Sequence, residues 1–112
     1  METKQMGDKP KPVKIFKMDH VVQHYTMNSH VGRFEGHIEF FRESMHTSSA
    51  LRIFLDSGQL VGYVPADMVG EVLAFIGFRD SCPCKGIINR DYDRYIEQFY
   101  FWGECMITDP DA

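Results

Sequence analysis

The stretch SALRIFLDSGQLVGYVPADMVGEVLAFIG, residues 49 to 77, constrains the fold more than any other part of the chain. Leu51, Ile53 and Leu55 alternate with residues of the opposite face, and a period of two predicts a strand with one buried face. Residues 56–59 have turn chemistry, because Gly58 tolerates a positive φ. Residues 60–64 then return as the partner strand. The stretch therefore begins with a β-hairpin.

A short helix follows this hairpin. Pro65 has no N–H to donate to a sheet and suits the first turn of a helix, while Asp67 suits the free amides and the helix dipole there. An apolar stripe with helical spacing continues to Gly77, which ends the helix. The stripe comprises Met68, Val69, Val72, Leu73 and Ile76. We predict a helix within residues 65–77 and a core made of Leu51, Ile53, Val72, Leu73 and Ile76.

The rest of the chain has further strand patterns but no alternation of strands with helices. We predict a first strand within residues 14–26, a loop at 28–36, a strand at 37–41, a polar loop at 42–49 and a connector at 80–86. A second hairpin follows, with a polar turn at 90–94 and an aromatic return strand at 95–107. This order indicates a mainly β (α+β) protein, a small six-stranded barrel with one or two short helices.

Charge is distributed unevenly along the 112 residues, a length that suits one domain. Residues 1–17 hold five lysines against two acids, a net charge of +3, and residues 18–112 hold seven basic against fourteen acidic residues, a net charge of −7. We expect a flexible basic N-terminal tail (1–17), one domain (18–107) and an acidic C-terminal tail (108–112). An acidic body does not attract nucleic acid through its overall field, so any such contact must come from a small local patch or from the tail.

The chain has the features of a cytoplasmic, intracellular protein. No apolar run approaches the roughly 18 residues that a membrane span needs. The N-terminal segment has neither the apolar region nor the cleavage site of a secretory signal. Three cysteines, an odd number, do not indicate a secreted disulfide framework. We therefore expect no membrane partner.

Short motifs follow one another along residues 20–103 in an order that is more specific than any one of them. A glycine-led strand ends in Arg-Glu, an Ala-Leu strand and a turn follow, then Val-Gly-Tyr, a helix and a closing hairpin. The motif positions are Gly36, Arg42-Glu43, Ala50-Leu51, Gly58, 61–65, 85–88 and 101–103. In this order the chain resembles the HIRAN domain. The resemblance implies an OB-like or SH3-like barrel that holds the 3′ end of single-stranded DNA in a pocket.

The resemblance also suggests candidate DNA-binding residues. His24 and Tyr25 stand where the family has an aromatic-and-arginine segment, although the arginine is missing. Tyr63 matches the family's Gly-Tyr/His position. Residues 45–49 lack the tyrosine and aspartate of the family's loop. Single-strand binders combine aromatic faces with cations, so we predict contacts from Tyr25, Tyr63 and His24, with Arg33 as phosphate partner.

Other chemistries have weaker support. Cys82, Cys84 and Cys105 with a histidine would form a zinc site only with an unusual one-residue gap, so we expect buried thiols and no metal. His20 and His24 have i, i+4 spacing, which suits a metal only on a helix. No phosphate-binding loop and no framed nucleophile or triad spacing is present. We therefore expect no cofactor and no enzymatic activity.

Two functions of different class remain open. The first is binding of single-stranded DNA in repair or processing, which the resemblance and the many aromatic residues favour. The second is protein–protein interaction, or inhibition by a phage or mobile-element type of module that kept the barrel and lost the DNA pocket, which the acidic body favours. The expected partner is single-stranded DNA or a protein, and the sequence predicts no oligomeric state.

Overall fold

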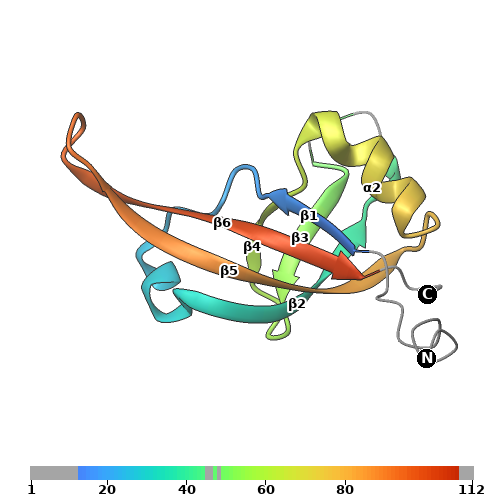
Figure 1. The fold of residues 1–112 in the computed structure, drawn as a ribbon, viewed down its shortest axis with the longest axis horizontal. Helices are drawn as coiled ribbons and strands as arrows, with labels where there is room; N and C mark the ends of the chain where they lie inside the picture. Colours follow the sequence, from blue (N-terminus) through green and yellow to red (C-terminus); the bar gives the residue numbers. More distant parts are fainter. Residues whose placement is uncertain (1–12, 45–46, 48, 109–112) are drawn as a thin grey trace, which may run out of the picture.

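A single antiparallel sheet of six strands dominates the computed structural model, which describes residues 13–44, 47 and 49–108. The strands lie in the order β1-β6-β5-β2-β3-β4, and the sheet curls into a half-barrel (Figure 1). They are β1 (Val13–Lys17), β2 (Gly32–Phe40), β3 (Leu51–Leu55), β4 (Leu60–Tyr63), β5 (Ser81–Asp93) and β6 (Gln98–Thr108). The helical segments are η1 (Tyr25–His30), η2 (Arg42–Ser44), η3 (Ala66–Met68) and α2 (Val69–Phe75). The prediction of a mainly β, six-stranded, barrel-like fold is confirmed.

The central hairpin forms where the sequence predicted it. β3 and β4 pair in antiparallel fashion, with Arg52 opposite Tyr63. Gly58 has a φ of +95°, and its N–H donates to Leu55 O at 2.8 Å. Glycine is favoured there because other residues rarely adopt a positive φ. The turn therefore fixes the register that buries one face of β3.

The predicted helix and core are also present. η3 and α2 lie within residues 65–77, and Gly77 has a φ of +69° just after α2. The five predicted core side chains are all at most 2% exposed. Among the described residues no polar or charged residue is buried, so the interior is apolar throughout. No helix in the described ranges is long and apolar enough to cross a membrane.

Residues 18–22 join the two ends of the sheet. This segment leaves β1, passes β6 and then pairs with β4, which is the opposite edge in strand order. Its backbone hydrogen bonds are Met18 N–H to Gly103 O (2.8 Å), Asp19 N–H to Tyr63 O (2.7 Å), Tyr63 N–H to Asp19 O (2.8 Å) and Val22 N–H to Val61 O (2.8 Å). We call residues 18–22 the seam. It satisfies backbone groups of β4 that an open edge would leave unpaired.

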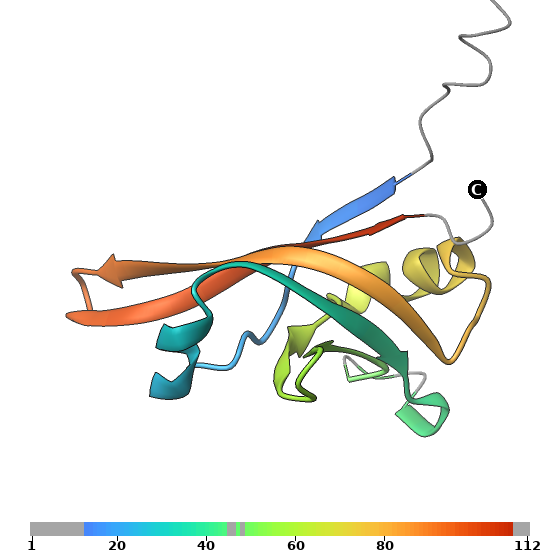
Figure 2. The same ribbon diagram turned by 90° about the horizontal axis from the view of Figure 1, so that it is seen from below.

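A long hairpin projects from this half-barrel (Figures 1 and 2). β5 pairs with β2 only as far as Ile88, which lies opposite Gly32. Beyond that point β5 and β6 pair only with each other, from Asn89 opposite Trp102 to Asp93 opposite Gln98. We call residues 89–102 the arm. It contributes to the elongated shape of the molecule, which measures 55 × 37 × 27 Å.

Two segments that contain glycine or proline were predicted as a loop and a connector, but the structure shows that they contribute to strands. Residues 28–36 were expected to form a loop, but β2 already begins at Gly32. Gly36 serves a close strand contact, because a Cβ there would lie 1.9 Å from Phe54 O. The connector expected at 80–86 is the start of β5. Pro83 is tolerated because the pairing of β5 with β6 starts only at Lys85.

Two predicted boundaries are also wrong. The N-terminal tail was expected to reach residue 17, but β1 begins at Val13 and pairs with β6. The polar turn expected at 90–94 lies at 94–97, where Asp93 Oδ1 accepts from Tyr95 N–H at 2.8 Å. This aspartate bond starts the turn after the strand, so residues 90–93 remain extended. β6 continues to Thr108; residues 1–12 and 109–112 lie outside the described residues.

Candidate functional site

His24 and Tyr25 lie together at the start of η1. His24 occupies the N-cap position, and its ring nitrogen Nδ1 accepts a 3.3 Å hydrogen bond from Thr26 N–H. The His24 and Tyr25 rings stack with centroids 4.3 Å apart and planes inclined by 37°. Tyr25 is 74% exposed. The preceding residue, Gln23, bonds the backbone of Phe101, so the two rings lie near the base of the arm.

A second aromatic group lies on one face of the arm. Arg90 pairs with Phe101, and Tyr92 pairs with Phe99, so these four side chains share one face of the two-stranded ribbon. Phe101 is buried, which identifies this face as the continuation of the barrel interior. The Arg90 guanidinium carbon lies 4.0 Å from the centre of the Phe99 ring, and the Tyr92 and Phe99 centroids are 5.0 Å apart. Both rings remain more than half exposed.

The Gln23–Phe101 hydrogen bonds connect the segments that carry these two groups, and we name the groups together the aromatic platform: His24, Tyr25, Arg90, Tyr92 and Phe99. Figure 2 shows η1 on the side toward which the sheet curls, close to the base of the arm. No acidic residue occurs in residues 24–30, and none lies on the arm face that carries Arg90. Asp91 and Asp93 point to the opposite face, where Asp91 accepts from Trp102 Nε1 at 2.6 Å. The platform therefore combines exposed rings with a cation and has no carboxylate of its own.

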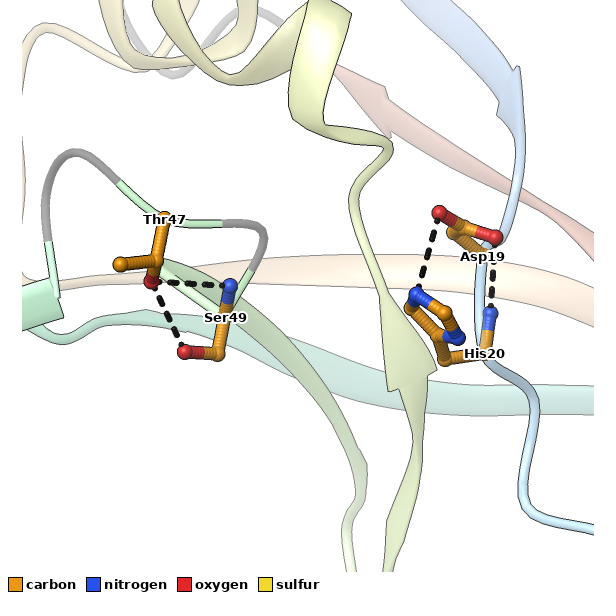
Figure 3. A network of polar contacts seen from close by, with 4 residues as sticks. All are labelled: Asp19, His20, Thr47 and Ser49. Carbon is orange, nitrogen blue, oxygen red and sulfur yellow. Dashed lines mark hydrogen bonds and ion pairs between the residues drawn. The ribbon is translucent and has the colours of Figure 1, made fainter.

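The predicted contact Tyr63 belongs to a separate cluster at the end of β4. The His20 ring meets the Tyr63 ring edge-on at 6.1 Å, and His20 has a φ of +48°, rare for a residue other than glycine. Asp19 holds His20 in two ways, through the backbone N–H at 3.0 Å and the ring at 3.6 Å (Figure 3). Arg52, opposite Tyr63, stacks on Phe41 at 3.8 Å.

The hydroxyls of Thr47 and Ser49 lie near the cluster of Tyr63 and His20. Thr47 Oγ1 and Ser49 Oγ are 3.0 Å apart, and Figure 3 shows them across the end of β4 from Asp19 and His20. Ser49 O accepts from Arg52 Nε at 3.1 Å. The rest of the loop at 45–49, namely Met45, His46 and Ser48, lies outside the described residues. The hydroxyls organise the loop, and the Ser49 backbone carbonyl holds the Arg52 side chain.

Arg33, the predicted phosphate partner, has no contact with Tyr25 or Tyr63 among the described ring, hydrogen-bond and ion-pair contacts. It lies on the outer face of β2, opposite Ile87, in a groove of about 570 Å³. Three locations thus hold the four predicted residues: His24 with Tyr25, Tyr63 with His20, and Arg33 in the outer groove. Sequence reasoning did not single out Arg90, Tyr92 and Phe99, because residues 90–94 were expected to form a turn. The alternation of Arg90 and Tyr92 with aspartates was the available signal.

The three cysteines lie in the barrel interior as free, buried thiols. Burial, and then the neighbouring Cys84, raise the pKa of the Cys82 thiol. The side-chain hydrogen bond with Cys84, and then burial, raise the pKa of the Cys105 thiol. Both thiols are therefore protonated at neutral pH, and the protonated form is a poor nucleophile. In the described part of the chain no group of three or more His, Cys, Asp or Glu residues is arranged to hold a metal ion.

Comparisons with known proteins give no relative from which a role could be transferred to these residues. No protein-family model, curated protein or solved structure matches the chain.

Proposed function

We propose that this chain is a HIRAN-like binding module without enzymatic activity, and that its ligand is single-stranded DNA. The observation that carries the proposal is the aromatic platform. Unpaired bases stack on aromatic side chains, while arginine adds a cation for the phosphates. Tyr25, Tyr92 and Phe99 supply the rings and Arg90 supplies the cation. In an otherwise acidic body, a surface without carboxylates is where a polyanion encounters least repulsion.

The resemblance to the HIRAN domain supports DNA rather than another polyanion, and supports the 3′ end as the preferred position. The platform differs from the site predicted from the resemblance, because His24 and Tyr25 contribute to it while Tyr63 and Arg33 do not. Tyr63 belongs instead to the cluster with His20 and Arg52. An end-binding contact at that cluster would be separate from base stacking on the arm.

The test is fluorescence anisotropy with a labelled oligothymidine of about 10 nucleotides, within the range of site sizes of small single-strand-binding modules. Tyr25→Ala and Phe99→Ala should each weaken binding roughly ten- to a hundredfold, since stacking is worth about 1–3 kcal/mol per base. Tyr100→Ala is the matched control, because Tyr100 lies opposite Asp91 on the other face of the same arm. Duplex DNA of equal length should bind weakly, since its bases are not free to stack.

Two further measurements and one excluding outcome complete this assay. A shallow salt dependence is expected, with a slope of about −1 in log–log form, because Arg90 is the only arginine or lysine of the platform. A 3′-blocked oligonucleotide should bind less tightly than one with a free 3′ hydroxyl. Absence of binding even at about 50 mM salt, where electrostatic contacts are strongest, would exclude DNA as the ligand.

A protein-binding role is the second candidate. It is favoured by the tip of the arm, where Tyr95 is 95% exposed and Ile96 is 60% exposed. Exposed aromatic and aliphatic side chains at the end of a hairpin are suited to insertion into a pocket of a partner protein. If DNA does not bind, Tyr95→Ala becomes the first variant to test in the search for a protein partner.

A further inference from the structure

The outer face of the sheet presents an ordered charge pattern over β1, β6, β5 and β2, away from the aromatic platform. Paired residues of antiparallel strands share a face, so the register defines rows across the sheet. One row consists of Ile15, Met106, Lys85 and Glu35. The next row consists of Lys17, Glu104, Ile87 and Arg33. We call this surface the outer face.

The middle of the outer face is apolar and open. Ile15 is 57% exposed and Ile87 is 37% exposed, and with Met106 they line the groove of about 570 Å³. Exposed apolar groups that line one concave surface, bordered by charges, are typical of a protein–protein contact.

The charges bordering the groove have no side-chain partner among the described residues. Arg33, Glu35, Lys85 and Glu104 make no side-chain hydrogen bond or ion pair with any described residue. Two of these four are positive and two are negative, so the border of the groove has no net charge. Lys17 lies at the end of the second row, outside the groove lining, with its ammonium 5.4 Å from the centre of the Trp102 ring. The contrast with the rest of the chain is large, because residues 18–112 carry a net charge of −7.

We propose that the outer face binds a second copy of this chain and forms a symmetric dimer. In a two-fold interface the same surface meets itself, so a face of one charge sign would repel its copy. A neutral border with alternating signs avoids that repulsion, and an unrelated charged partner would not require it. Of the surfaces described above, this one combines an apolar centre with charges that can pair across a two-fold axis.

The order of the rows specifies which charges pair. We place the two-fold axis in the interface, parallel to the two rows and midway between them. The first row of one copy then faces the second row of the other copy. Glu35 then faces Arg33 of the second copy, and Arg33 faces its Glu35, so the pair forms twice. The groove and its border are small, so we expect a dissociation constant in the micromolar range.

Charge reversal tests this arrangement. Sedimentation velocity of the full chain at about 100 μM should show a dimer, above the expected dissociation constant. Arg33→Glu alone should weaken dimerisation about a hundredfold, because two glutamates then face each other twice, and Glu35→Arg alone should do so for two arginines. An equimolar mixture of the two variants should form a heterodimer, since each opposing pair again has opposite charges.

Measurements of folding, and a variant of the aromatic platform, provide controls for the dimerisation experiment. Both residues are exposed, so circular dichroism and the thermal midpoint of each variant should match the parent. Ile15→Asp, at a second exposed site of the groove, should also abolish the dimer. Phe99→Ala lies on the arm and should leave dimerisation unchanged. A parent that is monomeric at about 100 μM, or variants whose mixture does not associate, would overturn the proposal.

Discussion

Gln23 binds the backbone of Phe101 through both ends of its side-chain amide. Its Nε2 donates to Phe101 O at 2.7 Å, and its Oε1 accepts from Phe101 N–H at 2.8 Å. A side chain thus occupies the place that a neighbouring strand would take beside β6. It connects the segment leading to His24 and Tyr25 with the base of the arm.

Gln23→Ala should lower the free energy of unfolding by about 1–2 kcal/mol, because the side chain loses both hydrogen bonds to Phe101 and a third, from Nε2 to Val21 O at 2.8 Å. Urea unfolding measures the change. Gln98→Ala is the control, since the exposed Gln98 side chain makes no hydrogen bond with a described residue, and it should stay within about 0.5 kcal/mol of the parent. Equal effects of the two variants would show that the Phe101 contact does not stabilise the fold.

Leu73→Ala should cost about 2–5 kcal/mol of unfolding free energy. Leu73 is 2% exposed and packs in the core beneath the central hairpin, so its loss leaves a cavity. Ala74→Ser, on the exposed side of the same helix, should change the stability by less than about 1 kcal/mol. Thermal unfolding of both variants is the measurement, and a Leu73→Ala variant that melts with the parent would contradict this packing.

Two glycine-to-alanine substitutions should have opposite signs. At Gly36 the new Cβ would lie 1.9 Å from Phe54 O, so the strands must separate and Gly36→Ala should cost at least about 2 kcal/mol. At Gly70, in α2, no atom lies within 4 Å of an added Cβ, so Gly70→Ala should stabilise by about 0.4–1 kcal/mol. Chemical denaturation compares the two. Destabilisation of equal size at both positions would contradict this account of the β2–β3 contact.

High pH should destabilise the protein through its buried thiols. The pKa values of Cys82 and Cys105 are raised in the folded state, whereas an unfolded thiol titrates near 8.5. Below about pH 8.5 the two thiols are protonated in both states, and their contribution to the free energy of unfolding is fully present. Above about pH 8.5 the thiols of the unfolded chain lose protons that the folded chain keeps, so the free energy of unfolding falls. Cys105→Ala should show a smaller decline between about pH 8 and 10. An unchanged decline would assign the pH dependence to other groups.

The same burial makes the thiols unreactive in the native state. Because only the thiolate attacks, a thiol-specific reagent should label none of the three cysteines in native buffer and all three in denaturant. The readout is the mass of the intact protein after a short exposure. Rapid labelling of a native cysteine would show that the interior opens at β5 or β6.

Local chemistry explains which parts of the fold the sequence could predict. The hairpin of β3 and β4 and the helix after Pro65 depend on neighbours in the chain: the alternation from Leu51 to Leu55, the turn at Gly58 and the stripe around Leu73. Each of these signals extends over fewer than ten residues. They could therefore be read without knowing the tertiary structure.

The seam depends on contacts between distant residues and was not predicted, whereas the hairpin that forms the arm was predicted with its turn at 90–94 instead of 94–97. Gln23 and Phe101 are separated by 78 positions, and nothing in either segment identifies the other. The same holds for Asp19 and Tyr63, whose pairing curls the sheet. The prediction of the candidate site was the least complete. The contact between Arg90 and Phe99 depends on the register of β5 and β6, which the sequence does not specify.

The strand order also determines when this chain can fold during synthesis. Among the described strands β1 is synthesised first, and its strand partner is β6, the last of them. β2, β3 and β4 can pair with one another early, but the partner of Val13 is Thr108. Until β6 emerges, β1 and its apolar side chains stay unpaired and open to association with other nascent chains. Completion of the sheet therefore waits for the synthesis of β6.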